Sequence, residues 1–245
     1  MISASRTDAL WACAYQFRPG LAMLRDEPSV GGLTGTLFHS MAEAHNDGRD
    51  VTELSLPGAD ETRAQRMFEQ FAPWWSTYRH GTEWISEMPF AYSLTTGEGR
   101  RLPPMGQRNY SEAKPDEIPG TADAVALEQD RVVVVDYKTG SARYVTPANK
   151  SKQLLTLALA ATRSYGVDRA TVVIVTVSDL APPNADEHEV DALDLDMFED
   201  ELRAKVAGIP TSAPVAGEHC RFCRHRHECP AAQAKYRNEG RRRVA

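Results

Sequence analysis

The residues most able to do chemistry lie where an apolar segment ends in Asp136-Tyr137-Lys138-Thr139-Gly140. Side chains two apart on a β-strand project from the same face. Asp136 and Lys138 are therefore predicted to share one face, with Tyr137 on the other. Asp123 lies on what we expect to be the preceding strand, and pairing through a turn at 128–130 brings the two carboxylates together. Converging carboxylates favour a hard divalent cation, and a neighbouring lysine can orient water and stabilise charge developing on a phosphate.

Two further residues can add to this site. His39 lies on a predicted helix, and a neutral imidazole facing the carboxylates favours manganese over calcium. Glu87 offers another carboxylate from an earlier strand. Taken singly, each has a simpler interpretation: an exposed ion pair for Asp-x-Lys, a turn-side carboxylate for Asp123, a packed helix residue for His39 and a solvated side chain for Glu87. Their agreement in one arrangement, in this chain order, favours a metal site.

The cysteines suggest a second site. Cys220, Cys223 and Cys229 form a C-x2-C-x5-C pattern near one end of the sequence, and Cys13 lies near the other. In an intracellular protein, such a pattern indicates metal or redox chemistry before a structural disulfide. Four thiolates can hold an iron–sulfur cluster or a tetrahedral zinc ion, and the spacing leaves both open. Either would join the two ends of the chain and add to the folding free energy.

Composition sets further bounds on the 245-residue chain. The formal charge of -6 argues weakly against a nucleic-acid partner, but the charge is segregated. Residues 186–201 are acidic without Lys or Arg, and the sequence from 221 onward is rich in Arg. Local basic patches bind phosphate whatever the total charge, although the run at 241–243 is more typical of a solvated tail. No apolar run is long enough to span a bilayer, and no secretory signal is evident, so we expect a soluble, cytoplasmic protein.

The periodicity of the sequence predicts the elements that position these residues. We expect mixed β-structure with helices on its faces. A helix capped by Ser5 carries Cys13, and one capped by Asp60 ends near Gly81. The other predicted helices cover 34–46, 147–165 and 195–207, and a short basic helix comes last. The predicted strands cover 84–94, 118–127, 131–137 and 170–177. We expect a turn at 31–36, a loop at 95–117 and a second loop in the acidic stretch after 186.

The motifs resemble those of a known family. Gly-x-x-x-His on a helix, Gly-x-x-Asp on a strand and Asp-Tyr-Lys-Thr-Gly on the next strand are similar to the RecB-like branch of the PD-(D/E)XK nucleases, as is Ser3-Ala4-Ser5-Arg6 before Cys13. The resemblance covers most of the chain and is weakest over 95–117. It implies an α/β, restriction-endonuclease-like mixed sheet (αβββαβ core) flanked by helices. It also implies a single domain, 1–245, in which 1–30 and 209–245 form an iron–sulfur subdomain joined by a four-cysteine cluster.

The resemblance also implies roles for residues. His39, Asp123, Asp136 and the Tyr137 backbone carbonyl would hold Mg²⁺ or Mn²⁺; Lys138 would be the catalytic lysine, acting with Asp136 and Asp123, and Glu87 would be an additional acidic residue. The family often continues with Gln-x-x-x-Tyr on the next helix. Here Gln153 begins that motif, but Leu157 replaces the tyrosine. The part this helix plays in DNA contact is therefore left open.

The split cysteine set resembles that of CRISPR-associated RecB-like exonucleases and AddAB-type helicase–nucleases, which enclose a [4Fe–4S] cluster; this favours a cluster over Zn²⁺. Gln153, Arg221 and Arg224 are candidate DNA contacts, although the arginines can also serve only to solvate a loop. We expect a metal-dependent exonuclease acting on single-stranded DNA or DNA ends. The alternatives are an inactive DNA-binding or assembly factor and a zinc protein that uses the four cysteines. The sequence encodes no helicase motif, so a helicase or CRISPR-integration partner is a further expectation, and DNA repair, CRISPR acquisition and phage DNA metabolism all remain open.

Overall fold

The centre of the molecule is one twisted sheet. The computed structural model describes residues 2–21, 29–78, 80–103 and 109–242, with side chains described as far as Arg237. The strands Arg131–Thr139 (β4) and Arg169–Val177 (β5) pair in parallel, and the other neighbouring strands pair antiparallel. This mixed α/β sheet confirms the predicted fold class. In spatial order the six strands are β2 (Gly99–Arg101), β1 (Ile85–Ser93), β3 (Glu117–Glu128), β4 (Arg131–Thr139), β5 (Arg169–Val177) and β6 (Asn184–Val190).

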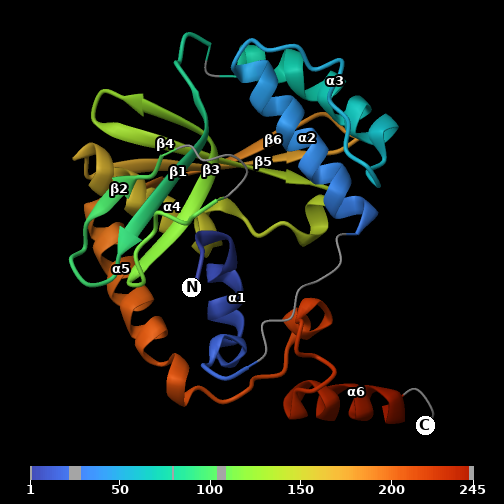
Figure 1. Cartoon of the computed structure of the whole chain (residues 1–245), viewed down its shortest axis with the longest axis vertical. Coiled ribbons are helices and arrows are strands. Elements are labelled where there is room, and N and C mark those ends of the chain that lie inside the picture. The colour runs from blue at the N-terminus through green and yellow to red at the C-terminus, as the bar shows by residue number, and fades with distance from the viewer. Residues whose placement is uncertain (1, 22–28, 79, 104–108, 243–245) are drawn as a thin grey trace.

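Helices cover both faces of this sheet (Figure 1). The α-helices are α1 (Thr7–Ala12), α2 (Val30–Asn46), α3 (Glu61–Thr77), α4 (Lys152–Tyr165), α5 (Ala192–Ala207) and α6 (Pro230–Arg242). One face packs against α2 and α3, and the other against α4 and α5. Figure 1 shows α6 away from the sheet, at the far end of the C-terminal segment. Among the described helices, none is both long and apolar enough to cross a membrane.

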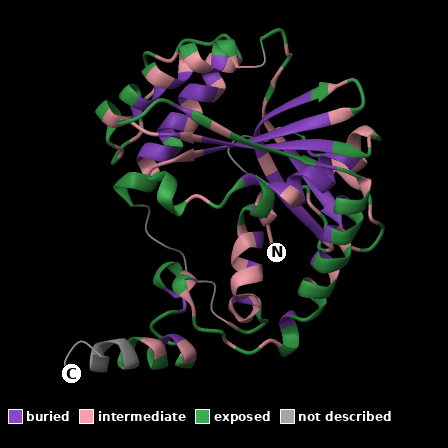
Figure 2. Cartoon of the chain, turned by 180° about the vertical axis from the view of Figure 1, so that it is seen from behind, coloured by how far each residue is buried: buried purple, intermediate pink, exposed green. Residues whose placement is uncertain are grey.

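The valine run in β4 explains why the sheet is buried on both sides. Val132 and Val134 belong to the core beneath α4, while Val133 and Val135 belong to the core beneath α2 and α3. All four side chains are fully buried. A strand covered on both faces is expected to read as a continuous apolar run. Figure 2 shows the resulting buried layer through the middle of the molecule.

The first turns of α2 correct one prediction. Residues 31–36 are helical, because Ser29 caps α2 and its side chain accepts a hydrogen bond from Gly32 N. Gly35 serves a close approach: a Cβ there would lie 2.7 Å from Thr139 Oγ1 on β4. Gly35 thus lets α2 approach the end of β4 closely, and the glycine-rich stretch is helical instead of forming a turn. This packing places the next turn of α2, with His39, above the strand ends.

Two short strands are also missing from the sequence-based prediction. The acidic stretch after 186 belongs to β6, whose side chains are almost all exposed. An edge strand that is polar on both faces lacks the alternation by which strands are recognised. The three-residue strand β2 lies inside the predicted loop 95–117, part of which, 104–108, lies outside the described residues. Both edges of the sheet are therefore structures that the pattern alone does not indicate.

The helix ends differ from prediction in informative ways. Ser5 caps no helix, because it lies inside a 3-10 helix, Ala4–Arg6, and α1 ends before Cys13, whose backbone is extended. The remaining 3-10 helices are Ala14–Phe17, Ala142–Tyr144, Ala148–Lys150, Ile209–Thr211 and Glu218–Phe222. The helix predicted to start at Pro147 begins at Lys152, after the 3-10 helix Ala148–Lys150. The predicted cap of α3 is confirmed, since Asp60 accepts from Arg63 N, although α3 ends at Thr77 and not near Gly81.

Candidate active site

An imidazole–carboxylate pair joins α2 to β3. His39 Nδ1 lies 3.0 Å from Asp123 Oδ1. The second oxygen of Asp123 accepts a hydrogen bond from the backbone N–H of Tyr137 on β4. Asp123 is only 3% exposed, and a buried carboxylate is stable only when its oxygens have partners. Asp123 is therefore fixed between the helix and the neighbouring strand.

Glu87 is brought to this pair by an unusual backbone conformation. Its φ is +44°, the only positive φ of a non-glycine residue among those described. The β1–β3 register runs through Ser86 opposite Ala124 and Met88 opposite Ala122, but omits Glu87 and Asp123. Such a conformation costs about 1–3 kcal/mol and persists where surrounding structure enforces it, often at functional sites. One ligand atom from each of His39, Glu87 and Asp123 lies within 4.8 Å of the others.

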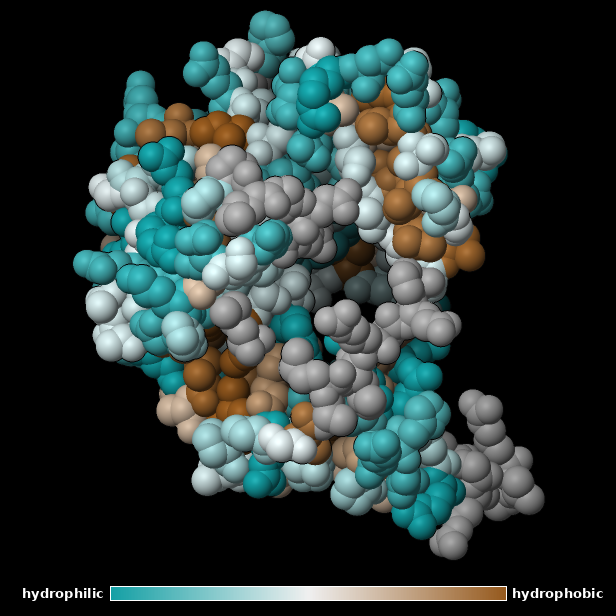
Figure 3. Space-filling view, viewed as in Figure 1, coloured by the Kyte–Doolittle hydropathy of each residue, from teal (hydrophilic) through white to brown (hydrophobic). Residues whose placement is uncertain are grey.

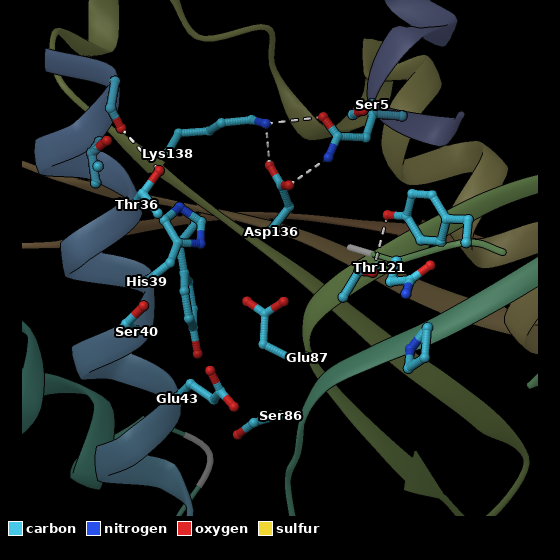
Figure 4. Close-up of a pocket in the computed structure, with 18 of the residues that line it drawn as sticks. Ser5, Thr36, His39, Ser40, Glu43, Ser86, Glu87, Thr121, Asp136 and Lys138 are labelled. Carbon is cyan, nitrogen blue, oxygen red and sulfur yellow. Dashed lines mark hydrogen bonds and ion pairs between the residues drawn. The ribbon is translucent and has the colours of Figure 1, made fainter. Parts of the chain in front are cut away.

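Asp136, Lys138 and Gln153 form a second, adjacent group. Lys138 Nζ lies 2.5 Å from Asp136 Oδ2 and donates to Gln153 Oε1 at 3.0 Å. Gln153 Nε2 donates to the other oxygen of Asp136 at 2.6 Å, which closes a ring of three contacts. Figure 4 shows Lys138 and Asp136 pointing toward one another above Glu87 and His39. Asp136 and Lys138 thus share one strand face, as the two-residue period predicts.

The electrostatics of Asp136 link the two groups. Burial raises the pKa of its carboxyl above the usual value, and the charge of Asp123 raises that pKa further. The Lys138 ammonium acts in the opposite direction and lowers it, as does His39. Two acids that perturb each other's titration lie close together. The structure therefore brings Asp123 and Asp136 to one place, with Asp136 paired to the lysine and Asp123 to the histidine.

Tyr137 points away from this site into the core under α3. Its ring contacts Phe71 and Trp75 edge-on, with centroids 5.0 and 5.4 Å apart. Burial raises the pKa of its phenol well above the ordinary value, so the side chain stays neutral. Its hydroxyl accepts from Asn46 Nδ2 at 3.4 Å. The aromatic packing holds the end of β4 in place, while the proposed ligand role of the Tyr137 carbonyl stays a prediction.

The site residues open into a cavity of about 930 Å³, seen as a hollow beside α2 in Figure 3. His39, Glu87, Asp136, Lys138 and Gln153 all line it. Sequence reasoning missed several other lining residues. Thr36 and Glu43 could have been found, because residues three and four positions from His39 share its helix face; Ser40 directly follows His39. The wall also includes Ser5, Tyr110 and Thr121, which no local pattern indicates.

Leu157, which stands where the family's Gln-x-x-x-Tyr motif has tyrosine, is a core residue. It is 1% exposed and belongs to the core beneath α4. A Cβ at Gly120 would lie 2.8 Å from Leu157 Cδ2, so the two positions pack tightly against each other. Of the two motif positions on α4, only Gln153 lines the cavity.

The four cysteines converge from both ends of the chain. None is in a disulfide, and Cys13 and Cys220 are buried. Burial raises the pKa of the Cys223 thiol, and the charges of Cys13, Cys220 and Cys229 raise it further. Among the described residues, however, the thiols form no group of three whose sulfur atoms all lie within 4.8 Å of one another. An iron–sulfur cluster or a zinc ion at these cysteines therefore stays a prediction.

The two arginines predicted as DNA contacts lie in different places. Arg221 lines a separate cavity of about 540 Å³ in the C-terminal segment. It does not line the cavity of about 930 Å³ that contains His39 and Lys138, which we call the catalytic cavity. Burial lowers the pKa of Arg6, and the nearby charge of Arg224 lowers it further. Arg6 follows Ser5, which lines the catalytic cavity. The role of both arginines in DNA contact stays a prediction.

The amino-acid sequence of most of the chain matches a known family. The model of the PD-(D/E)XK nuclease superfamily matches residues 1–230. The chain belongs to this superfamily. Members of the PD-(D/E)XK superfamily are metal-dependent nucleases, so this protein is a nuclease that uses a divalent metal, with DNA as its substrate. The ring of Asp136, Lys138 and Gln153 and the adjoining His39, Glu87 and Asp123 are where its chemistry is expected.

Other comparisons add little to this assignment. The solved structure entitled "Crystal structure of SSO0001" is 15% identical in sequence, with a TM-score of 0.39; the match covers 92% of this chain and 96% of that one. No curated protein matches the sequence. The membership therefore rests on the superfamily match over residues 1–230.

Proposed function

We propose that this PD-(D/E)XK nuclease is a RecB-like exonuclease that acts on single-stranded DNA or DNA ends and carries a structural [4Fe–4S] cluster. One observation carries the catalytic part of the proposal. His39, Glu87 and Asp123 have ligand atoms within 4.8 Å of each other, and His39 and Glu87 line the same cavity as the Lys138–Asp136 ion pair. These are the residue types that hold a divalent cation next to a reacting phosphate.

The donor set fits Mg²⁺ or Mn²⁺. One ring nitrogen and two carboxylates favour a first-row or hard divalent ion, and the buried carboxylate of Asp123 needs partners for its oxygens. Asp136 and the Tyr137 carbonyl are proposed as further ligands. When bound, the cation supplies positive charge that stabilises the phosphodiester transition state and lowers the pKa of water.

The protein's own residues supply the rest. Lys138 orients the attacking water and donates to charge developing on the phosphate. Asp136 balances the ammonium charge, and Gln153 limits the side-chain freedom of both through its two hydrogen bonds. Positioning of this kind can contribute several kcal/mol to a reaction barrier.

The preference for single strands or ends is supported by the shape and lining of the site. The residues line a cavity with α2 on one wall and β1 and β3 on another. A separated strand can present its backbone inside a cavity more easily than an intact duplex. Tyr110 on the wall offers an aromatic side chain for base stacking, which is typical of proteins that bind single strands.

A cleavage assay tests the catalytic proposal. End-labelled linear DNA, in single- and double-stranded form, is incubated with Mg²⁺ or Mn²⁺, beside circular single-stranded DNA. We expect shortening of linear single strands and intact circles. Lys138→Ala should reduce the rate by about 10²–10³-fold, whereas Lys205→Ala, an exposed lysine on α5, should not change it.

Several outcomes would contradict this assignment. Undiminished cleavage by Lys138→Ala removes the lysine from the mechanism, and cleavage of circles excludes a strict exonuclease. DNA binding without cleavage, insensitive to Asp136→Ala, would support an inactive binding or assembly factor. A helicase or CRISPR-integration partner is a separate proposal, tested by purifying the protein from its native cell.

The cluster has its own test. It is supported by the charges of Cys13, from the first part of the chain, and of Cys220 and Cys229, from the last, which raise the pKa of the Cys223 thiol; none of the four cysteines is in a disulfide. Anaerobically purified protein is expected to contain about four iron and four acid-labile sulfide per chain. One zinc per chain without iron would replace the cluster by a zinc site and leave the nuclease proposal standing.

A further inference from the structure

The N-terminus of α4 is held by a residue from the other end of the sequence. Asp8, on α1, accepts hydrogen bonds from the backbone N–H groups of Lys152 (2.9 Å) and Gln153 (3.3 Å), one with each carboxylate oxygen. A local cap is also present, because Ser151 Oγ accepts from Leu154 N at 3.3 Å. The first N–H groups of a helix have no partner within the helix. Here Asp8 and Ser151 divide them, and the charge of Asp8 also suits the positive end of the helix dipole.

The two caps hold different residues. Ser151 holds Leu154, which is fully buried in the core. Asp8 holds Gln153, whose side chain lines the catalytic cavity and contacts both Lys138 and Asp136. A side chain on the first turn of a helix is placed only as well as that turn is fixed. Gln153 thus donates to Asp8 through its backbone N–H and contacts Lys138 and Asp136 through its side chain.

Asp8 is itself on firmly packed structure. Leu10, two residues later, is 0% exposed. Before it, Thr7 Oγ1 donates to Ala4 O at 2.6 Å, and Thr156 Oγ1 of α4 donates to Thr7 Oγ1 at 3.4 Å. Ala4 packs directly on Gly120 of β3: a Cβ added at Gly120 would lie 2.4 Å from the Cβ of Ala4. The segment around Asp8 therefore cannot shift without disturbing the sheet.

We propose that Asp8 is a positioning residue of the nuclease site. By fixing the first turn of α4, it sets the place of the Gln153 amide and, through that amide, the relative orientation of Lys138 and Asp136. The inference rests on the proposed function only for its effect on catalysis, because the placement of Gln153 can be measured without DNA.

The kinetic test compares the two caps of the same helix. Asp8→Ala is expected to lower kcat by about 10-fold or more with little change in KM for single-stranded DNA, since small displacements in an active site are costly. Ser151→Ala removes the other cap and should lower the unfolding temperature comparably while leaving kcat within about 2-fold. Asp8→Asn, which keeps an acceptor oxygen, should recover part of the lost kcat. Equal kcat losses in Asp8→Ala and Ser151→Ala would overturn the proposal.

A double variant shows whether Asp8 acts through Gln153. Residues of one network have non-additive effects. Asp8→Ala introduced into Gln153→Ala should therefore lower kcat by less than about 2-fold beyond Gln153→Ala alone. Full additivity of the two losses would show that Asp8 acts by another route and would contradict the inference.

A spectroscopic test separates this inference from the nuclease proposal. The side-chain amide of Gln153, assigned by its loss in Gln153→Glu, is followed by NMR in the full chain without DNA. Its hydrogens should exchange with solvent at least about 10-fold faster in Asp8→Ala than in wild type or Ser151→Ala. Unchanged exchange in Asp8→Ala overturns the positioning role, even if the protein cleaves DNA. If Asp8→Ala does not fold, Asp8→Asn replaces it, with a smaller increase expected. Absence of cleavage by the wild type would contradict only the proposed function.

Discussion

The catalytic cavity and the cysteine site are built in opposite ways. The site residues His39, Glu87, Asp123, Asp136, Lys138 and Gln153 lie on long elements, α2, β1, β3, β4 and α4, that pack into two cores on either side of the sheet. The cysteines lie at ends and turns: Cys13 follows the six-residue α1, and Cys220 is in a 3-10 helix. The first site follows from the fold. The second joins the end of the firmly packed α1 segment to a C-terminal segment that the fold holds only loosely.

Burial makes the difference concrete. Between residues 210 and 229 only Cys220 and His225 are buried, and Phe222 is 72% exposed. A segment with so little buried apolar area opens locally at small free-energy cost. The cysteine site is therefore expected to depend on what the thiols bind, whereas the catalytic cavity is expected to keep its shape without metal.

The largest effect should come from breaking the cysteine site. Cys229→Ser removes one of four ligands, and a bound metal group can contribute about 10 kcal/mol to folding. We expect proteolysis within 210–229 to become at least about 100-fold faster, with the far-UV circular dichroism of the sheet retained. Glu228→Ala, at an exposed neighbour, is the control. Equal protease resistance in both variants would mean that the fold alone holds this segment.

A smaller effect is expected from the tight contact between Gly35 and Thr139 in the wall of the catalytic cavity. Gly35→Ala places a Cβ 2.7 Å from Thr139 Oγ1 and should cost about 1–3 kcal/mol of unfolding free energy. Gly31→Ala is the matched control, because nothing lies within 4 Å of its Cβ, and it should be neutral or stabilising. Urea unfolding measures both. Thr139→Ala combined with Gly35→Ala should restore stability, and a failure to do so would place the strain elsewhere.

The smallest effect concerns pH and an ion pair between β2 and β3. The Arg100 guanidinium lowers the pKa of the Glu117 carboxyl below its usual value. Such a group stabilises the folded state above its unfolded-state pKa, and the stabilisation is lost as pH falls through the folded-state value. Wild type should exceed Glu117→Gln in stability by about 1 kcal/mol at pH 7, since Arg100 is partly exposed and water screens the pair.

Below about pH 4 this difference should shrink. Thermal unfolding at pH 7 and pH 3.5 measures the change, and protease sensitivity of 210–229 should not follow it. A stability difference that is the same at both pH values would mean that the ion pair does not act through the charge of Glu117.

The sequence predicts the catalytic side of this comparison well, for local reasons. The two-residue strand period places Asp136 and Lys138 together and Tyr137 in the opposite core. The strand pairing through the turn at 128–130 is also predicted, and it explains why Asp123 contacts Tyr137 N. These are contacts between neighbouring elements whose geometry follows from backbone period alone.

What the sequence did not reveal depends on contacts between distant segments. Asp8 is one acidic residue among 34 Asp and Glu, and only the packing of α1 against α4 shows its two hydrogen bonds. The positive φ of Glu87 is imposed by its surroundings, since glutamate does not favour it. That Glu87, rather than Asp136, joins His39 and Asp123 in the tightest group follows from this backbone turn.

The acidic edge strand has a consequence for how copies of the protein behave at high concentration. The valine-rich strands β4 and β5 are of the kind that aggregates when a partner strand can add to it. They are shielded on one flank by β6, which carries Asp186, Glu187 and Glu189 and, among the described strands, pairs only with β5. A second molecule docking there would set like charges against each other. β6, for which the sequence predicts a loop, thus limits growth of the sheet into fibrils.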